Sequence, residues 1–295
     1  MLITYSSLQC FQSCHQKYKL RYMDCIVPKE KSNALEFGSA MHIALEQYFK
    51  HVRTSQAFLD LTGVCDFRFD CNKILTNKVE ASKLAGLLAG YIRKWYPDDY
   101  SNHDIIEIEK EFKVRIVGND FVGKIDGLLR NKETGKYYIL EHKTASIVDE
   151  AYVAQKEIDS QTLNYANAIQ MDMGIEVSGA IHDIITKQKI RQKKGESEED
   201  FCKRLEEDVT DDNFERIVVE FSPGQLEESL AELQSQMQEL HECRRFHKCT
   251  GACLGRFGAC EYLPICRSGG LIDSIKDKYE TTRAHEEISE STLSE

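Results

Sequence analysis

The chain has 295 residues and a formal net charge of −11, with 41% hydrophobic and 29% charged residues. These values are ordinary for a soluble globular protein, and the length suits one elaborated domain or two smaller ones. Because no apolar run approaches the length of a membrane span and the amino terminus lacks a signal-peptide pattern, we expect a protein inside the cell and outside any membrane.

The acidic total argues against a nucleic-acid-binding protein, but the charges are unevenly distributed along the chain. Basic and aromatic residues are interleaved in the first 31 positions: Lys17, Lys19, Arg21, Lys29 and Lys31, with Tyr5, Phe11, Tyr18 and Tyr22. A second basic run occupies residues 187–194. Basic segments that contain aromatic residues suit a path for a single nucleic-acid strand, although the second run alone is equally typical of a solvated surface.

Helical periodicity predicts three helices in the first 100 residues, over about 6–23, 36–52 and 77–95. The Ser6-Ser7 pair can cap the first helix, and the third is expected to end before Pro97.

Alternation of apolar and polar residues then predicts strands over 105–117, 121–126, 137–141 and 177–185. Helical spacing predicts a helix over 159–171, before the last strand. The order α–β–β–β–α–β is typical of an α/β (α+β) fold with a mixed β-sheet core flanked by helices.

The last quarter of the chain begins with a helix signal. Residues 222–225 have the pattern of a capping box with Pro at the first helical position, which predicts a long amphipathic helix towards His247. After Cys266 the chain is polar and is expected to be flexible.

Two acidic residues and a lysine occupy the predicted hairpin. Asp126 lies on its first strand, and Glu141 and Lys143 lie two positions apart on its second strand, so their side chains share a face while His142 points away. Carboxylates can hold Mg²⁺ or Mn²⁺, and a lysine can orient water and offset phosphate charge. The alternative is a surface hairpin with solvated charges, but the apolar run before Glu141 favours a buried site, where carboxylates need a partner.

Three further residues are candidates for this site. His42 follows small residues on the second predicted helix, and imidazole is a ligand for Mn²⁺, although an isolated histidine on an apolar face is more often a core residue. Gln161 and Tyr165 lie one helical turn apart on the same face, where they can hydrogen-bond a phosphate or the lysine. Chance placement on a half-exposed helix would produce the same pair.

Eleven cysteines in an intracellular protein indicate metal or cluster ligation, not disulfides. Five of them crowd the carboxyl end: Cys243, Cys249, Cys253, Cys260 and Cys266. A local zinc site would use four of these residues, for example Cys249, Cys253, Cys260 and Cys266. In the alternative, Cys14 joins three of them around a [4Fe–4S] cluster.

Five short pieces occur in an order that resembles a known family. They are SSLQCFQSCHQKYKLRYM with Cys14, FGSAMHIALE with His42, Asp126, Glu141-His142-Lys143, and QTLNYANAI with Gln161 and Tyr165. Together with the cysteine-rich end they resemble the PD-(D/E)XK nucleases, and among these the RecB-like exonucleases that include CRISPR-associated and AddB-type iron–sulfur nucleases. The resemblance covers about residues 5–266.

The resemblance implies a restriction-endonuclease-like sheet and a catalytic role for Asp126, Glu141, Lys143, Gln161 and Tyr165. It implies that His42, Asp126 and Glu141 bind Mg²⁺ or Mn²⁺. A glutamate on the preceding strand, Glu109 or Glu111, is often near the metal in this family, although an exposed strand face explains these two residues equally well.

The resemblance also favours the iron–sulfur cluster, with Cys14, Cys253, Cys260 and Cys266 as ligands in a structural role. The family's usual C-x-x-C spacing is absent, so Cys249 and Cys243 are substitutes to consider. We therefore expect a helical amino-terminal region (1–100), a nuclease core (101–222), a helix with the cysteine-rich cluster-binding region (223–268) and a flexible tail (269–295).

The implied function is a metal-dependent DNA exonuclease acting on single strands or duplex ends, in DNA repair, recombination or phage DNA processing, in a bacterial or phage-infected cytoplasm. The chain lacks the G-x-x-x-x-G-K-[ST] phosphate loop of a helicase, so unwinding would need a helicase or recombination partner. A non-catalytic DNA-binding or assembly subunit and an RNA-directed nuclease are the alternatives.

Overall fold

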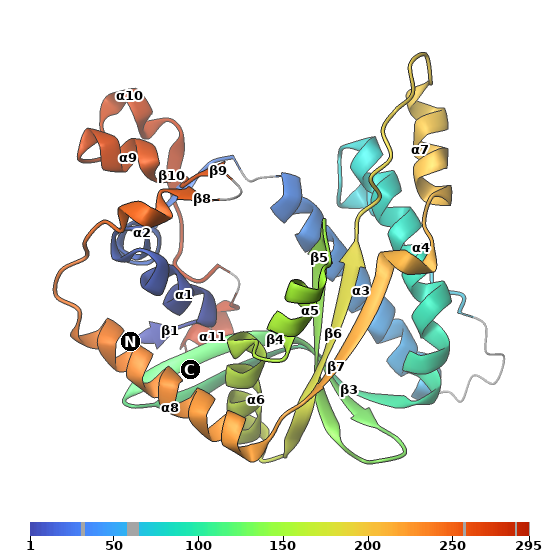
Figure 1. Cartoon of the computed structure of the whole chain (residues 1–295), viewed down its shortest axis with the longest axis horizontal. Helices are drawn as coiled ribbons and strands as arrows, with labels where there is room; N and C mark the ends of the chain where they lie inside the picture. The colour runs from blue at the N-terminus through green and yellow to red at the C-terminus, as the bar shows by residue number, and fades with distance from the viewer. Residues whose placement is uncertain (31–32, 58–64, 256–257, 287, 295) are drawn as a thin grey trace. The chain divides into compact units, whose positions relative to one another are not determined.

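The computed structural model describes residues 1–30, 33–57, 65–255, 258–286 and 288–294. The chain forms two compact units, which we call the sheet unit (Ser32–Lys110 and Ile125–Leu226) and the terminal unit (Met1–Lys31, Glu111–Lys124 and Glu227–Glu295). Strands β3 (His103–Ile116) and β4 (Asn119–Asn131) each contribute residues to both units (Figure 1).

The sheet unit is built on a mixed β-sheet. Its strands are the first part of β3 and the second part of β4, which pair with each other, then β5 (Tyr137–Ala145), β6 (Val177–Thr186) and β7 (Phe214–Glu220). The β4–β5 and β6–β7 pairs are antiparallel, whereas β5 and β6 are parallel and place Glu141 beside His182. Ile139, Leu140 and Ile184 are almost fully buried, as expected for strands covered on both faces.

Helices cover both faces of this sheet. The long helices α3 (Asn33–Ala57) and α4 (Lys78–Ser101) share one apolar core with alternate residues of β5, including Tyr138 and Leu140. Residues 139, 141 and 143 point to the opposite face, which Figure 1 shows covered by α5 (Glu150–Lys156) and α6 (Ser160–Met173). Helix α7 (Glu198–Glu207) packs against α4, where Gly86 allows close approach to the Glu206 backbone.

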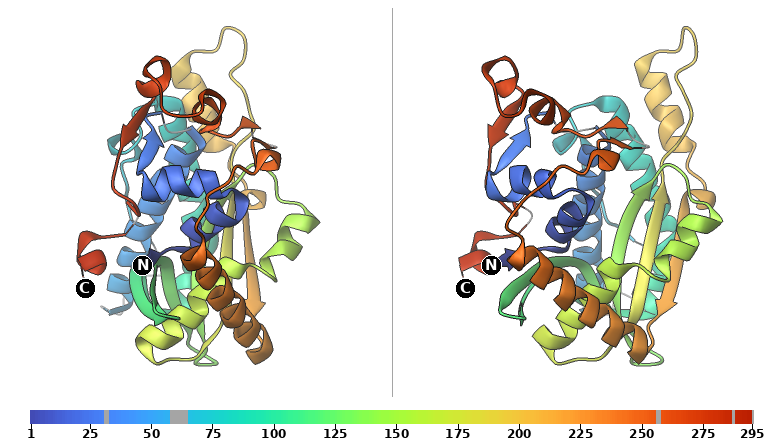
Figure 2. Two further views of the ribbon diagram at one scale, coloured as in Figure 1. Left: turned by 90° about the vertical axis from the view of Figure 1, so that its left-hand side faces the viewer. Right: turned by 60° about the vertical axis from the view of Figure 1, so that its left-hand side comes forward.

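The terminal unit joins both ends of the chain. Strand β1 (Leu2–Ile3) pairs in parallel with the first part of β4, beside the N label in both views of Figure 2. Helices α1 (Tyr5–Ser13) and α2 (His15–Tyr18) lead into the π-helix η1 (Lys19–Met23) and strand β2 (Ile26–Pro28). The remaining elements are α8 (Pro223–Glu242), β8 (Leu254–Gly255), β9 (Gly258–Ala259), α9 (Leu263–Ser268), α10 (Asp273–Lys276), β10 (Tyr279–Thr281) and α11 (Glu290–Ser294).

Several expected element boundaries are wrong. Thr4, not Ser6-Ser7, caps the first helix, and the extended backbone of Cys14 (φ −164°, ψ 112°) divides that helix into α1 and α2. Helix α4 continues through Pro97 to Ser101, because the buried Asp99 beyond the proline is held by Tyr48 and Arg216. Helix α8 ends at Glu242, before His247.

Other elements lie where no element was expected. Strand β7 and helices α5 and α7 were not predicted. Residues 269–295, expected to be flexible, contain β10, which pairs with β2 and places Tyr279 in a small core with Leu20, Tyr262 and Ile265. The division into four regions remains a prediction.

Among the described residues, no helix has the length and apolar character needed to cross a membrane.

Candidate active site

Asp126 lies at the centre of the candidate site. Its Oδ1 is 3.1 Å from Nδ1 of His42 on α3, and its Oδ2 accepts a hydrogen bond of 2.7 Å from the backbone N–H of His142 on β5. Burial alone would raise the pKa of Asp126, but the charge of His42 and the hydrogen bonds from both histidines outweigh burial and hold the pKa well below its usual value. The carboxylate therefore stays ionised although it is buried.

Glu141 and Lys143 form an ion pair on the face of β5 opposite His142. The Glu141 side chain is only 4% exposed, whereas that of Lys143 is 33% exposed. Burial and the nearby charge of Asp126 raise the pKa of Glu141. Burial would lower the pKa of Lys143, but the charge of Glu141 outweighs it and raises the pKa. The lysine is therefore a permanent cation beside two carboxylates.

Helix α6 brings an amide to the lysine. Oε1 of Gln161, in the first turn, lies 3.5 Å from Nζ of Lys143. Asp159 caps this helix by accepting the backbone N–H of Gln161 at 3.0 Å, and Nζ of Lys156 lies 3.1 Å from the same carboxylate. Tyr165 lies one turn further along α6 and is buried.

The structure therefore gathers most of the residues predicted from sequence. Asp126, Glu141 and Lys143 lie close enough for their charges to shift one another's pKa, and His42 and Gln161 contact members of this group. His142, which was expected to point away from Glu141 and Lys143, contacts Asp126: its main-chain N–H donates to that carboxylate, and its Nδ1 lies 3.5 Å from Oδ2.

Two groups of described side chains have the spacing of metal ligands, but in one of them, Asp98, Asp99 and His103, both carboxylates are paired with Arg216. The other group lies at the candidate site. Potential ligand atoms of His42, Asp126 and His142 all lie within 4.8 Å of one another. Glu141 lies outside this set, and its carboxylate is instead paired with Lys143. A carboxylate and two imidazoles suit Mn²⁺ better than Mg²⁺.

Neither glutamate of the preceding strand belongs to this set of ligands. Glu111 accepts hydrogen bonds from Ser289 and Thr292, all within the terminal unit. Glu109 is half-buried, and its positive φ of 51° marks an irregular point of β3.

A buried network of ion pairs lies next to His142. Its Nε2 lies 3.7 Å from Asp183, which binds Arg216 at 2.6 Å, and Arg216 also binds Asp98 and Asp99. Sequence analysis missed this network, although Asp183 offered a signal as a carboxylate inside the apolar run of β6.

The cysteines meet in a separate cavity of about 210 Å³ within the terminal unit. Its lining includes five thiols, those of Cys14, Cys249, Cys253, Cys260 and Cys266. The backbone N–H of Cys249 lies 3.4 Å from Sγ of Cys14, although the two residues are 235 positions apart. Cys243 is not part of this lining, and its thiol contacts the carbonyl of Arg245. Burial raises the pKa of Cys260 and of Cys266, which favours the thiol unless a cation binds.

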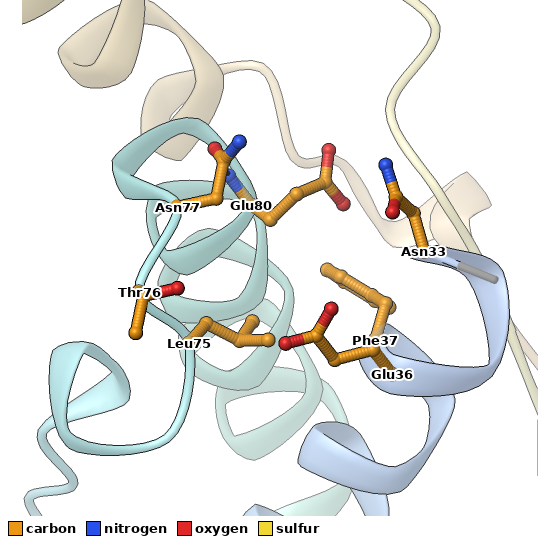
Figure 3. A pocket seen from close by; sticks show the side chains of 7 residues that line it. All are labelled: Asn33, Glu36, Phe37, Leu75, Thr76, Asn77 and Glu80. Atoms are coloured by element: carbon orange, nitrogen blue, oxygen red, sulfur yellow. Dashed lines mark hydrogen bonds between the residues drawn. The ribbon is translucent and has the colours of Figure 1, made fainter. Parts of the chain in front are cut away.

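A smaller cavity of about 60 Å³ lies at the starts of α3 and α4, and Figure 3 shows two carboxylates directed into it. Its lining contains none of the predicted site residues: Asn33, Glu36, Phe37, Leu75, Thr76, Asn77 and Glu80.

Known proteins resemble this chain in sequence pattern and in fold. A family model described as the PD-(D/E)XK nuclease superfamily matches residues 2–267. A solved structure of a candidate exonuclease from Eubacterium rectale has a TM-score of 0.50 at 16% identity, over 92% of this chain and 89% of that one. A second solved structure, SSO0001, covers 68% of this chain and 97% of its own at 11% identity, but its TM-score of 0.26 is too low to indicate a shared fold. No curated protein matches the chain.

The likeness to the first structure agrees with a restriction-endonuclease-like fold, a mixed sheet flanked by helices. The family match spans nearly the whole sequence and includes every candidate residue named above. The chain therefore belongs to the PD-(D/E)XK nuclease superfamily.

Proposed function

We propose that the protein is a metal-dependent DNA exonuclease that acts on single strands or duplex ends, in DNA repair, recombination or phage DNA processing. The observation that carries this proposal is the cluster of Asp126, Glu141 and Lys143, joined by His42 and Gln161. A lysine paired with one carboxylate and a second carboxylate held by histidines make a site that can bind a divalent cation and a phosphate together.

In this proposal His42, Asp126 and Glu141 hold Mg²⁺ or Mn²⁺, and the position of His142 makes its imidazole a further candidate ligand. Asp126 fits because its depressed pKa keeps it anionic at all physiological pH values. Glu141 fits because two buried carboxylates raise one another's energy, which a cation between them would relieve. A divalent ion held there supplies an activated water and neutralises charge on the phosphate.

Lys143 and the two residues of α6 act on the substrate. The ammonium of Lys143 stabilises the negative charge that develops on the phosphate oxygens during hydrolysis. Gln161 accepts a hydrogen bond from this ammonium and so fixes its direction. Tyr165 lies on the same helix and can donate its hydroxyl to the phosphate or support Gln161.

The cysteine cavity is proposed to hold a structural [4Fe–4S] cluster, with Cys14, Cys253, Cys260 and Cys266 as ligands and Cys249 as a fifth candidate. The proposal is supported by the gathering of five thiols, from both ends of the chain, around one cavity. Structural zinc remains the alternative.

A cleavage assay with 5′- and 3′-labelled DNA, single-stranded and duplex, and with labelled RNA tests the proposal in the presence of Mg²⁺ or Mn²⁺. We expect progressive shortening of DNA from an end, lost in Asp126→Asn and kept in Asp120→Asn, a matched control on the same strand whose carboxylate is paired with Arg115. Faster cleavage of RNA would identify an RNA-directed nuclease, and binding without cleavage would identify a non-catalytic subunit. Unwinding of duplex DNA would need a helicase or recombination partner.

A further inference from the structure

Polar side chains line one face of α1, α2 and η1. This row consists of Ser6, Gln9 and Ser13 on α1, Lys17 on α2 and Arg21 on η1. Together with Cys10 and Tyr22 they surround an open cavity of about 370 Å³ within the terminal unit. On α1 alone this row runs from Ser6 to Ser13, which spans about 10 Å at about 1.5 Å per residue. The row is therefore longer than one bound anion requires.

The cavity has a positive lining, although the whole chain is acidic. Its seven lining residues include two cations and no carboxylate. Lys17 is paired with Glu261 at 3.0 Å. In the described part of the chain, the guanidinium of Arg21 has no carboxylate within ion-pair distance, and it lies 5.6 Å from the ring centroid of Tyr22. Arg21 is thus available for an anion from outside the chain.

The remaining groups suit hydrogen bonding and stacking. Ser6, Gln9 and Ser13 are exposed. The Ser13 hydroxyl donates to the carbonyl of Cys10 and can accept a hydrogen bond, whereas the amide of Gln9 donates to Tyr5 and has a second N–H. The ring of Tyr22 lies 5.4 Å from Tyr18 and 5.1 Å from His285, which holds it in one orientation. Burial raises the pKa of Cys10 to about 11, so this thiol adds no negative charge to the lining.

We infer that this row is a binding surface for the sugar–phosphate backbone of single-stranded DNA, distinct from the residues of the candidate active site. Arg21 contacts a phosphate, Ser6 and the second amide N–H of Gln9 donate to further backbone oxygens, and the Tyr22 ring, stacked on His285, adds an apolar contact for a sugar. None of these groups distinguishes one base from another, which suits an enzyme that degrades a strand regardless of sequence. The inference rests on the proposed function for the identity of the nucleic acid.

Arg21→Ala is the diagnostic variant, and Lys19→Ala is its matched control. Both positions lie on η1, but Lys19 is paired with Asp24 and does not belong to the lining. Lys17 is a poorer choice, because it also lines the cysteine cavity. Gln9→Ala provides a second, uncharged probe of the row, and circular dichroism checks that each variant is folded.

Affinity is measured by fluorescence anisotropy with a labelled oligothymidylate in EDTA, where no metal-dependent cleavage occurs, at several salt concentrations. Arg21→Ala should weaken binding roughly five-fold or more and reduce the slope of log affinity against log salt by about 0.7. Gln9→Ala should weaken binding less and leave the slope unchanged. Hydrolysis of bis(p-nitrophenyl) phosphate with Mn²⁺ should be equal in all variants, because this small diester needs only the active site.

An Arg21→Ala variant that binds like Lys19→Ala, with the same salt slope, would overturn the inference. So would stronger wild-type binding to RNA or to duplex DNA than to the single strand, with the same dependence on Arg21. Failure of the proposed function would give a different result. A protein that binds the oligonucleotide through Arg21 but hydrolyses neither substrate would support the binding surface and contradict the proposed nuclease activity.

Discussion

Nδ1 of His42 lies 3.1 Å from Oδ1 of Asp126, although 84 positions separate the two residues in the chain. The contact joins a helix on one face of the sheet to a strand within it. The histidine lowers the pKa of the carboxylate, and the carboxylate raises that of the histidine. A metal cation bound between the two would therefore displace the proton of the histidine. We therefore expect His42→Asn to weaken Mn²⁺ binding about ten-fold or more, measured by isothermal titration.

When Lys143 is replaced, added Mn²⁺ should restore the stability of the protein but not its activity. Lys143→Met leaves Glu141 buried without its cation, which should cost about 1–3 kcal/mol, less than for a fully buried pair because the lysine is one-third exposed. Mn²⁺ should restore most of this loss, since a metal ion can neutralise the carboxylate, but should not restore cleavage. Urea unfolding of the variant with and without Mn²⁺ measures this effect. The same free energy of unfolding under both conditions would contradict the prediction.

The buried pair of Lys156 and Asp159 should position Gln161 from a distance. Their side chains are only 8% and 14% exposed, and Asp159 also caps the helix that carries Gln161. Lys156→Met should destabilise the protein by about 3 kcal/mol and lower kcat more than it changes KM, because Gln161 would lose its fixed place. The exposed pair of Lys136 and Glu220 is the control, and Lys136→Met should cost less than about 1 kcal/mol. Equal costs for the two lysines would contradict this role.

His182 should make the protein sensitive to acid. It is fully buried, and both of its ring nitrogens lack a hydrogen-bond partner in the described part of the chain. Burial lowers its pKa from 6.5 to about 4, so the unfolded chain takes up this proton first as pH falls. The contribution of neutral His182 to the free energy of unfolding is complete above pH 6.5. It is lost between pH 6.5 and about 4, by roughly 3 kcal/mol in total.

Urea unfolding at pH 7.5 and pH 4.5 checks this prediction. His182→Gln, which cannot be protonated in this range, should lose less stability between the two pH values than the wild type does. The same pH dependence in both proteins would assign the effect to other groups.

Cys14 should be essential to the centre in the cysteine cavity, whereas Cys243 should not. After anaerobic purification the wild type should be brown and contain iron and sulfide in equal amounts. Cys14→Ser should lose this colour and unfold at a lower temperature, because the cluster no longer joins the amino terminus to the carboxyl end. Cys243→Ser should retain both properties, since Cys243 does not line the cavity. Stoichiometric zinc in a colourless wild-type protein would contradict the cluster and identify the centre as structural zinc.

The sequence by itself determined the local geometry of the site. Glu141 and Lys143 share a face of β5 because side chains on a strand repeat every two residues, and Gln161 and Tyr165 share α6 because a helical turn spans about four. The capping box at Ser222 was also predicted from the sequence, since its side chain accepts a hydrogen bond from the backbone N–H of Gln225, only three residues away.

Only the tertiary structure decided which distant segments meet. Strand alternation directs His142 away from Glu141 and Lys143, but only the fold brings His42 of α3 beside it, so that both imidazoles lie near Asp126. The course of α4 through Pro97 depends on Arg216, more than a hundred positions later, and the pairing of β10 with β2 depends on the other end of the chain. Such contacts form because the whole chain buries its apolar surface and pairs the charges that become buried with it. The local periodicity of the sequence does not contain this information.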